Sequence, residues 1–288
     1  MESKSVIQAW ISDLQEVLEN QPLAVDDVRI GVFYTAVRLS DGHAGVAFTP
    51  RGLTDSVCCP QSAAEAPLAG TLAGRSAWSL AEYALSRAAL RRAVGVATLN
   101  ALSALALGRH AIPEARLLPG VDALDAAGVQ PQDRVALVGA FVPFIKRLRH
   151  QVAVLWVIDK HPEALRPDEK HLWCPPEKAP EALKKASLVI ITGSTLVEGG
   201  TDDLLQSVGS ACRVVMAGPT ASPWPPTFFA RGVDVLGGIH VTDGRRLLEV
   251  VSQGGSGYFF GDCAEKISIV RLGYGAGVGE RETGVPSR

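Results

Sequence analysis

Two adjacent cysteines, Cys58 and Cys59, are the residues of this sequence that best suit a soft divalent metal ion, because thiolates prefer such ions. The chain contains no CxxC or HxxxH spacing, so no zinc signature accompanies them. Further metal ligands would have to come from distant residues such as Cys174, Cys263 or His43. The alternative is an ordinary cysteine pair, and the sequence leaves both interpretations open.

Gly139 and Asp159 match part of a dinucleotide-binding fingerprint. Gly139 follows one apolar run, and Asp159 ends the next run 20 residues later, where an acid could hold a ribose hydroxyl. The turn lacks the GxGxxG pattern, Phe141 adds bulk and Pro143 removes an amide donor, so a pyrophosphate cradle is not expected. A modified ligand site and a plain turn beside a solvated acid both fit.

Hydroxyl side chains follow two later apolar runs. Thr192, Ser194 and Thr195 follow the first of these runs, and Thr220 follows the second. Hydroxyls and backbone amides at a strand end can bind an anionic group, so we count these residues as candidate ligand-binding groups. For the first cluster, an ordinary hydrogen-bonded turn fits equally well. Thr201, nearby, better suits a helix N-cap.

Two further features are ambiguous. Asn100 lies within the apolar segment 93–107, where a buried amide needs partners. It either satisfies backbone groups or projects into a cleft between domains, and we favour the cleft. The glycine-rich segment 253–259, QGGSGYF, is either a flexible turn or part of a site where the backbone approaches a ligand closely.

Five short apolar runs in the second half predict the strands that would position these residues. Helical stretches separate several of the runs, and small residues follow most of them, which favours the parallel sheet of a Rossmann-like α/β domain. Ligands bind such sheets outside the carboxyl ends of the strands, at the topological switch point. The runs cover residues 134–138, 152–158, 188–191, 213–216 and 233–236.

The first half predicts a smaller α+β unit. Helical periodicity covers residues 5–18 and 77–107, and a hairpin joins strands at 28–39 and 44–49. Prolines punctuate the segment that follows, so we place a domain boundary near Leu118. The predicted organisation is two domains and a mobile tail, which cover residues 1–117, 118–271 and 272–288.

Composition excludes several classes of partner. The 288 residues are 47% hydrophobic and 20% charged, which allows packed cores, and the net charge of -2 gives no reason to expect nucleic acid or an anionic membrane. The apolar segment 93–107 is too short to span a bilayer and is interpreted as a buried helix. Five cysteines without an export signal indicate a cytoplasmic protein.

Several segments, taken in their order along the chain, resemble a bacterial and archaeal family named for heavy-metal chelation. The resemblance covers roughly residues 7–270. It implies an enolase-N-terminal-like domain followed by a Rossmann-like domain, with a site in the cleft between them that Asn100, Gly139, Thr192 and Thr195 would face. The segments are IGVFYTAV at 30–37, GVATLNAL at 95–102, VGAF at 138–141, TGSTL at 192–196, GPT at 218–220 and GGSGY at 254–258.

This chain departs from the family pattern at two positions. Glu198 stands where the family commonly has Asn, and Ala140 stands where it commonly has His or Tyr. Because of these departures, the ligand roles of the family do not carry over directly to this chain.

The leading hypothesis is a protein that binds a metal ion, or a metal-containing small molecule, between two domains. Cys58 and Cys59 would be metal ligands together with strand-end groups. One alternative is an enzyme that uses a nucleotide or S-adenosylmethionine-type cofactor, with Asp159 at the ribose. A second alternative is a non-catalytic metabolite sensor, which an entirely apolar cleft would favour.

Overall fold

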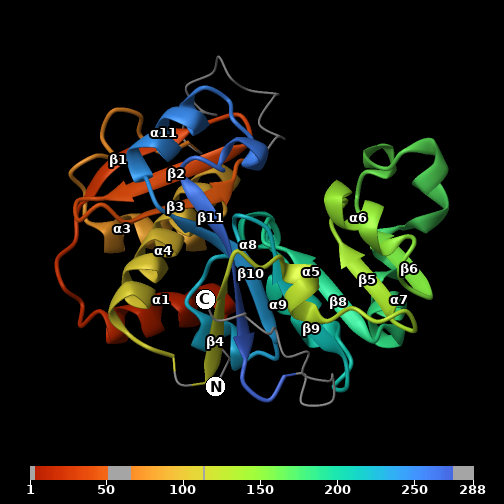
Figure 1. Ribbon diagram of the computed structural model, residues 1–288. Helices are drawn as coiled ribbons and strands as arrows, with labels where there is room; N and C mark the ends of the chain where they lie inside the picture. Colours follow the sequence, from red (N-terminus) through yellow and green to blue (C-terminus); the bar gives the residue numbers. More distant parts are fainter. Residues whose placement is uncertain (1–3, 51–65, 113, 275–288) are drawn as a thin grey trace, which may run out of the picture.

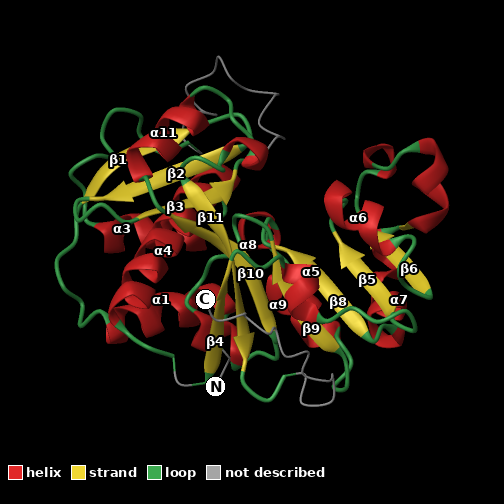
Figure 2. Ribbon diagram, viewed as in Figure 1, coloured by secondary structure: helices red, strands yellow, loops and turns green. Residues whose placement is uncertain are grey.

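The computed structural model describes residues 4–50, 66–112 and 114–274, and it contains two β-sheets (Figures 1 and 2). A three-stranded antiparallel sheet belongs to the N-terminal half, and an eight-stranded, mostly parallel sheet belongs mainly to the second half. The chain is therefore an α/β protein with a small first domain and a larger second one.

The first sheet has the order β1-β2-β3 and is accompanied by three helices. The hairpin predicted around residues 40–42 is confirmed as β2 and β3. The single strand predicted over 28–39 is wrong, because the chain turns at Gly31, where an added Cβ would lie 2.2 Å from the Val251 carbonyl oxygen. The elements are α1 (Val6–Val17), β1 (Val25–Ile30), β2 (Tyr34–Leu39), β3 (Ala44–Phe48), α3 (Ala77–Ala81) and α4 (Ala89–Arg109).

The second sheet has the order β4-β11-β10-β9-β8-β5-β6-β7, in which β5 to β10 are parallel and β4 and β11 are antiparallel. All five apolar runs predicted as strands are confirmed. The strands are β4 (Ala115–Pro119), β5 (Arg134–Val138), β6 (Val154–Ile158), β7 (Trp173–Cys174), β8 (Leu188–Thr192), β9 (Arg213–Ala217), β10 (Val235–Val241) and β11 (Ala264–Arg271).

Short helices connect these strands. The chain leaves β5 toward β6 on one side and later returns to β8 on the other, so the topological switch point lies between β5 and β8. The helices are α5 (Ala123–Ala127), α6 (Val142–Leu148), α7 (Ala179–Lys185), α8 (Thr195–Glu198), α9 (Thr201–Ser207), α10 (Pro225–Phe229) and α11 (Gly244–Ser252).

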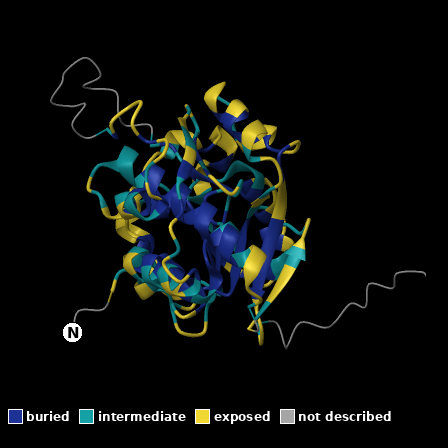
Figure 3. Ribbon diagram, turned by 90° about the vertical axis from the view of Figure 1, so that its left-hand side faces the viewer, coloured by how far each residue is buried: buried dark blue, intermediate teal, exposed yellow. Residues whose placement is uncertain are grey.

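Helix α4 is the central element of the protein. It packs against β3 so closely that a Cβ on Gly45 would lie 2.4 Å from the Ala101 amide. By length and composition α4 could cross a membrane, but 72% of its apolar window is buried inside the protein, which confirms the predicted buried helix. Its buried residues belong to one core with those of β8 and β9, and Figure 3 shows this continuous buried centre.

Helix α11 joins the second half to the first sheet. Its apolar residues Leu247 and Val251 pack with Ala36 and Val46 of the sheet, in a cluster separate from the core around α4. The first sheet is thus covered by α4 on one face and by a helix from the second half on the other (Figure 1). The predicted boundary between residues 117 and 118 falls inside β4, which pairs with β11.

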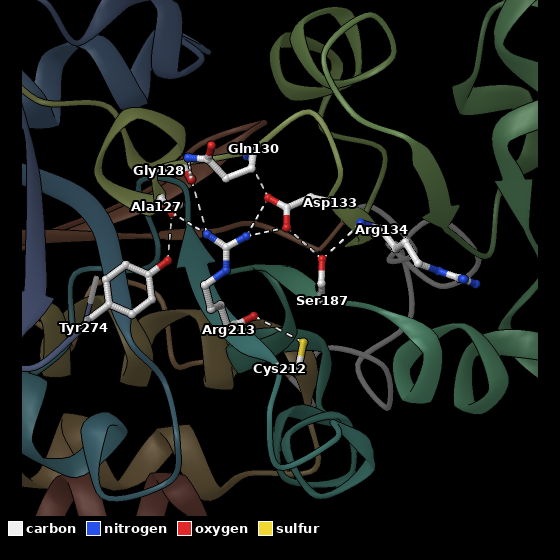
Figure 4. A network of polar contacts seen from close by, with 9 residues as sticks. All are labelled: Ala127, Gly128, Gln130, Asp133, Arg134, Ser187, Cys212, Arg213 and Tyr274. Atoms are coloured by element: carbon white, nitrogen blue, oxygen red, sulfur yellow. Dashed lines mark hydrogen bonds and ion pairs between the residues drawn. The ribbon is translucent and has the colours of Figure 1, made fainter. Parts of the chain in front are cut away.

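A polar network ties together the amino ends of the parallel strands (Figure 4). Arg213 at the start of β9 makes a 2.5 Å ion pair with Asp133, which also accepts hydrogen bonds from the Gln130 amide and the Ser187 hydroxyl. Burial alone would raise the pKa of Asp133, but these hydrogen bonds outweigh burial and hold the pKa below its ordinary value. The hydroxyl of Tyr274 donates to the Ala127 carbonyl beside this network.

Candidate functional site

A cleft of about 830 Å³ lies between the two domains, outside the carboxyl ends of β5 and β9 and against β10. Its size is within the range of about 300–1,000 Å³ that is usual for small-molecule sites. One wall comes from β2, β3 and the residues after α11. The other comes from the start of α6, and the floor comes from β10, β11 and the start of α5. Figure 1 shows two of the elements next to this cleft, α6, whose first residues line it, and α11, after which the opposite wall begins.

Aromatic side chains dominate the cleft. The chain has eight Phe and four Tyr, and seven of these twelve line this one cavity. Aromatic rings offer large flat apolar faces, so this lining suits a flat organic molecule. The seven residues are Phe33, Tyr34, Phe48, Phe141, Phe144, Tyr258 and Phe260.

Packing within each wall holds these rings. Tyr34 and Phe260 make an edge-to-face contact with centroids 5.2 Å apart, and Phe141 and Phe144 lie with centroids 4.4 Å apart. The short 3-10 helix η5 (Gly257–Phe259) follows α11 and carries Tyr258 into the cleft lining. Because α11 packs on the first sheet, this wall is attached to the N-terminal domain although it comes from the second half of the chain.

Two glycines keep the cleft open. Gly218, directly after β9, has φ +108°, a conformation that glycine adopts without strain, and an added Cβ would meet no atom within 4 Å. Gly261 also lines the cleft, and its Cβ direction is equally empty. A flat ligand can therefore lie directly against the backbone at both positions.

Asp122 and Lys266 are the charged residues among the described residues that line the cleft. The Asp122 carboxylate accepts the Leu124 amide at 3.0 Å and so caps α5. It also lies 3.4 Å from an Arg147 nitrogen and 3.3 Å from the Lys266 ammonium. A cation and an anion are thus positioned at the floor of a cavity whose other described lining residues are uncharged.

The turn after β5, where a modified ligand site or a plain turn was expected, is held by contacts within the protein. Gly139 has φ +96°, and its Cβ would lie 2.7 Å from the Thr192 methyl group, so close packing against Thr192 requires glycine here. The two Asp159 oxygens accept the amides of Ala140 at 2.7 Å and His161 at 2.8 Å. The Asp159 carboxylate thus fixes the turn after β5 rather than projecting freely into a cavity.

The hydroxyl cluster after β8 also bonds internally. The Thr195 hydroxyl donates to the Thr192 carbonyl at 2.9 Å and accepts from the Thr201 hydroxyl at 3.1 Å. Ser194 precedes α8, and its amide lies 3.4 Å from the Thr192 hydroxyl. Thr192, Ser194 and Thr195 do not line the cleft, and their proposed ligand role stays a prediction.

Asn100 and Thr220 join the two domains. The Asn100 amide nitrogen donates to the carbonyls of Val46 at 2.8 Å and Thr220 at 2.9 Å, while the Thr220 hydroxyl accepts the Phe48 amide at 2.9 Å. Asn100 lines a separate cavity of about 20 Å³ between β3 and β10, not the aromatic cleft. The amide nitrogen thus satisfies backbone groups, whereas the Asn100 Oδ1 is buried without a partner among the described residues, and a ligand role for Asn100 stays a prediction.

The metal hypothesis rests on residues that the structure does not describe. Cys58 and Cys59 lie outside the described ranges. Within those ranges, no group of three or more His, Cys, Asp or Glu side chains is arranged to hold a metal ion. Of the other suggested contributors, Cys174 and Cys263 are buried thiols, and burial raises the pKa of both.

Comparison with known families identifies both halves of the chain. A family profile described as "putative heavy-metal chelation" matches residues 122–269, and a second profile with the same description matches residues 11–103. The chain belongs to this heavy-metal chelation family. A comparison with proteins of curated function found no match.

Solved structures of the heavy-metal chelation family share the fold. A protein of unknown function from Pyrococcus horikoshii is 20% identical, with a TM-score of 0.73 over 93% of this chain and 100% of its own. A second, from Desulfitobacterium hafniense, is 17% identical, with a TM-score of 0.71 over 92% of this chain and 100% of its own. At these identities the likeness extends to the fold alone.

Proposed function

We propose that this protein binds a small, flat organic molecule in the aromatic cleft, and that any metal it handles arrives already held by that molecule. The observation that carries the proposal is the gathering of seven aromatic side chains around one cavity. Phe144 and Phe260 are buried behind the cleft surface, and the other five rings are at least partly exposed and offer stacking surfaces but few metal donors. This is the metal-containing small molecule of the leading hypothesis, in preference to a bare ion.

Binding is favoured over catalysis. The cleft lining has one carboxylate and one ammonium group among its described charged residues, and that carboxylate also caps α5. The cytoplasmic location and the enolase-like character of the first domain remain part of this proposal. The order β7-β6-β5-β8-β9-β10 supports a Rossmann-like second domain, because it matches the order 3-2-1-4-5-6 of doubly wound folds.

That strand order also supports a second candidate, an enzyme with a nucleotide or S-adenosylmethionine-type cofactor. The Thr192 methyl group beside Gly139 counts against it, because it occupies the position where such folds admit the cofactor. Thermal-shift titrations with NAD, AMP and S-adenosylmethionine test this candidate. Stabilisation by one of them would favour it over the first.

The test of the main proposal uses the one-to-one zinc complex of hydroxyquinoline sulfonate, a flat chelate that carries a sulfonate group, and zinc ion alone. We expect the complex to bind and Tyr258→Ala to weaken its binding about two- to tenfold, the effect of losing one aromatic contact. The matched control is Phe259→Ala. Phe259 is the next residue, is 66% exposed and does not line the cleft, so this change leaves binding unaltered.

The bare-ion hypothesis predicts a different result. Zinc ion alone would bind tightly, and a Cys58→Ser/Cys59→Ser double variant would lose it, while Tyr258→Ala would have no effect. That pattern, or the failure of the complex to bind at all, would overturn the proposal.

A further inference from the structure

We propose that Lys266 makes the cleft selective for organic anions, so that the ligand is a flat molecule that carries a carboxylate, sulfonate or phosphate. The inference rests on the binding function proposed above and adds the chemical class of the ligand.

Lys266 is positioned on the cleft side of β11. It pairs directly with Ile239 of β10, which also lines the cleft. Residues that are directly opposite in neighbouring strands project to the same face of a sheet. The Lys266 side chain is 69% exposed, so a bound ligand can reach its ammonium group.

Asp122 leaves Lys266 able to accept a ligand. Its Oδ1 accepts the Leu124 amide at 3.0 Å and lies 3.4 Å from Arg147, and its Oδ2 lies 3.3 Å from the Lys266 Nζ. The Asp122 charge is therefore shared between two cations and a helix cap. An ammonium group has three donors, and this one long contact uses a single donor. A ligand anion can take another donor without displacing Asp122.

The aromatic walls of the cleft would recognise the ring of the ligand, whereas Lys266 would recognise its anionic group. A bare inorganic anion would gain nothing from the aromatic walls at Tyr258 and Phe141. A neutral ring would stack there but would leave the Lys266 donors to water. A molecule with both parts uses the whole cavity, because its ring lies between the walls while its anionic group meets Lys266 at the floor.

Two fluorescent dyes with the same rings separate these contributions. Anilinonaphthalene sulfonate is an anion and phenylnaphthylamine is its neutral counterpart, and both brighten in an apolar site. We expect the anion to bind about three- to tenfold more tightly than the neutral dye, with a preference that Lys266→Met removes. Lys266→Arg should keep the preference, and raised salt should reduce it. Lys178→Met, which removes an exposed lysine outside the cleft, is the charge control.

The neutral dye distinguishes failure of this inference from failure of the proposed function. If phenylnaphthylamine binds and Tyr258→Ala weakens it, the binding function stands. Equal binding of the two dyes, or an equal effect of Lys266→Met on both, would then overturn the anion inference alone. If neither dye binds at a site that depends on Tyr258, both proposals fail.

Discussion

The two ends of the eight-stranded sheet differ in whether their polar groups are bonded within the protein or left accessible to a ligand. At the amino ends, Asp133, Arg213 and Ser187 bind one another in a buried network. At the carboxyl ends, aromatic rings surround a cavity of about 830 Å³, and Lys266 is largely exposed. Polar groups that are fully satisfied by the protein stabilise the fold, whereas unfilled apolar surface with one reachable charge is suited to a ligand.

This contrast predicts that substitutions at the amino ends of the strands lower the stability of the protein most. Asp133→Ala would leave the Arg213 guanidinium, only 25% exposed, without its counter-charge. We expect the free energy of unfolding to fall by about 3 kcal/mol, measured by urea denaturation. The control Asp125→Ala breaks an exposed pair with Arg147 and should lower stability by less than about 1 kcal/mol. Equal losses in the two variants would contradict the contrast.

A change at the carboxyl ends should instead affect binding and leave stability intact. Gly261 lines the cleft and a Cβ there would meet no atom within 4 Å, so we expect the indole of Gly261→Trp to occupy part of the cleft and to weaken phenylnaphthylamine binding by more than about tenfold. Gly261→Ala is the control, since its single methyl group leaves most of the cavity open. A large loss of unfolding free energy in Gly261→Trp would show that this end is also structural.

The smallest predicted effect is a dependence of stability on pH. The folded pKa of Asp133 lies below its unfolded value, so its contribution is present above about pH 3.9 and is lost as the pH falls through the folded value. The stability difference between wild type and Asp133→Asn should therefore narrow as the pH is lowered from about 6 to about 3. A difference that stays constant would mean that Asp133 does not titrate differently in the folded state.

Five strands of the parallel sheet could be predicted because each is a short apolar run. The two-residue parallel strand β7 and the antiparallel strands β4 and β11 were not predicted. The β11 sequence mixes exposed Glu265 and Lys266 with buried Ile267 and Ile269, and β4 is a short edge strand that only pairing with β11 defines. The positions of these strands in the sheet depend on contacts between residues far apart in the sequence, and no local sequence pattern indicates such contacts.

The cleft was harder to predict than the fold. Phe141 was interpreted as an obstacle to a nucleotide, whereas it lines the wall of a different cavity. The glycine-rich segment at 253–259 was a local signal, and Tyr258 within it lines the cleft, as do Gly218 and Pro219 of the GPT segment. The remaining rings come from separate elements, and side chains such as Thr195 that looked suited to binding could not be distinguished by sequence from side chains that cap a turn.

The packing of α11 on the first sheet has a consequence for synthesis on the ribosome. Strand β3 ends at Phe48, but the helix that covers Ala36 and Val46 ends at Ser252. At about 5–20 residues per second, roughly 10–40 s separate these two points of translation. During that interval the apolar outer face of the nascent sheet still lacks the helix that covers it in the folded protein, so chaperones that bind apolar surface would be needed most in this window.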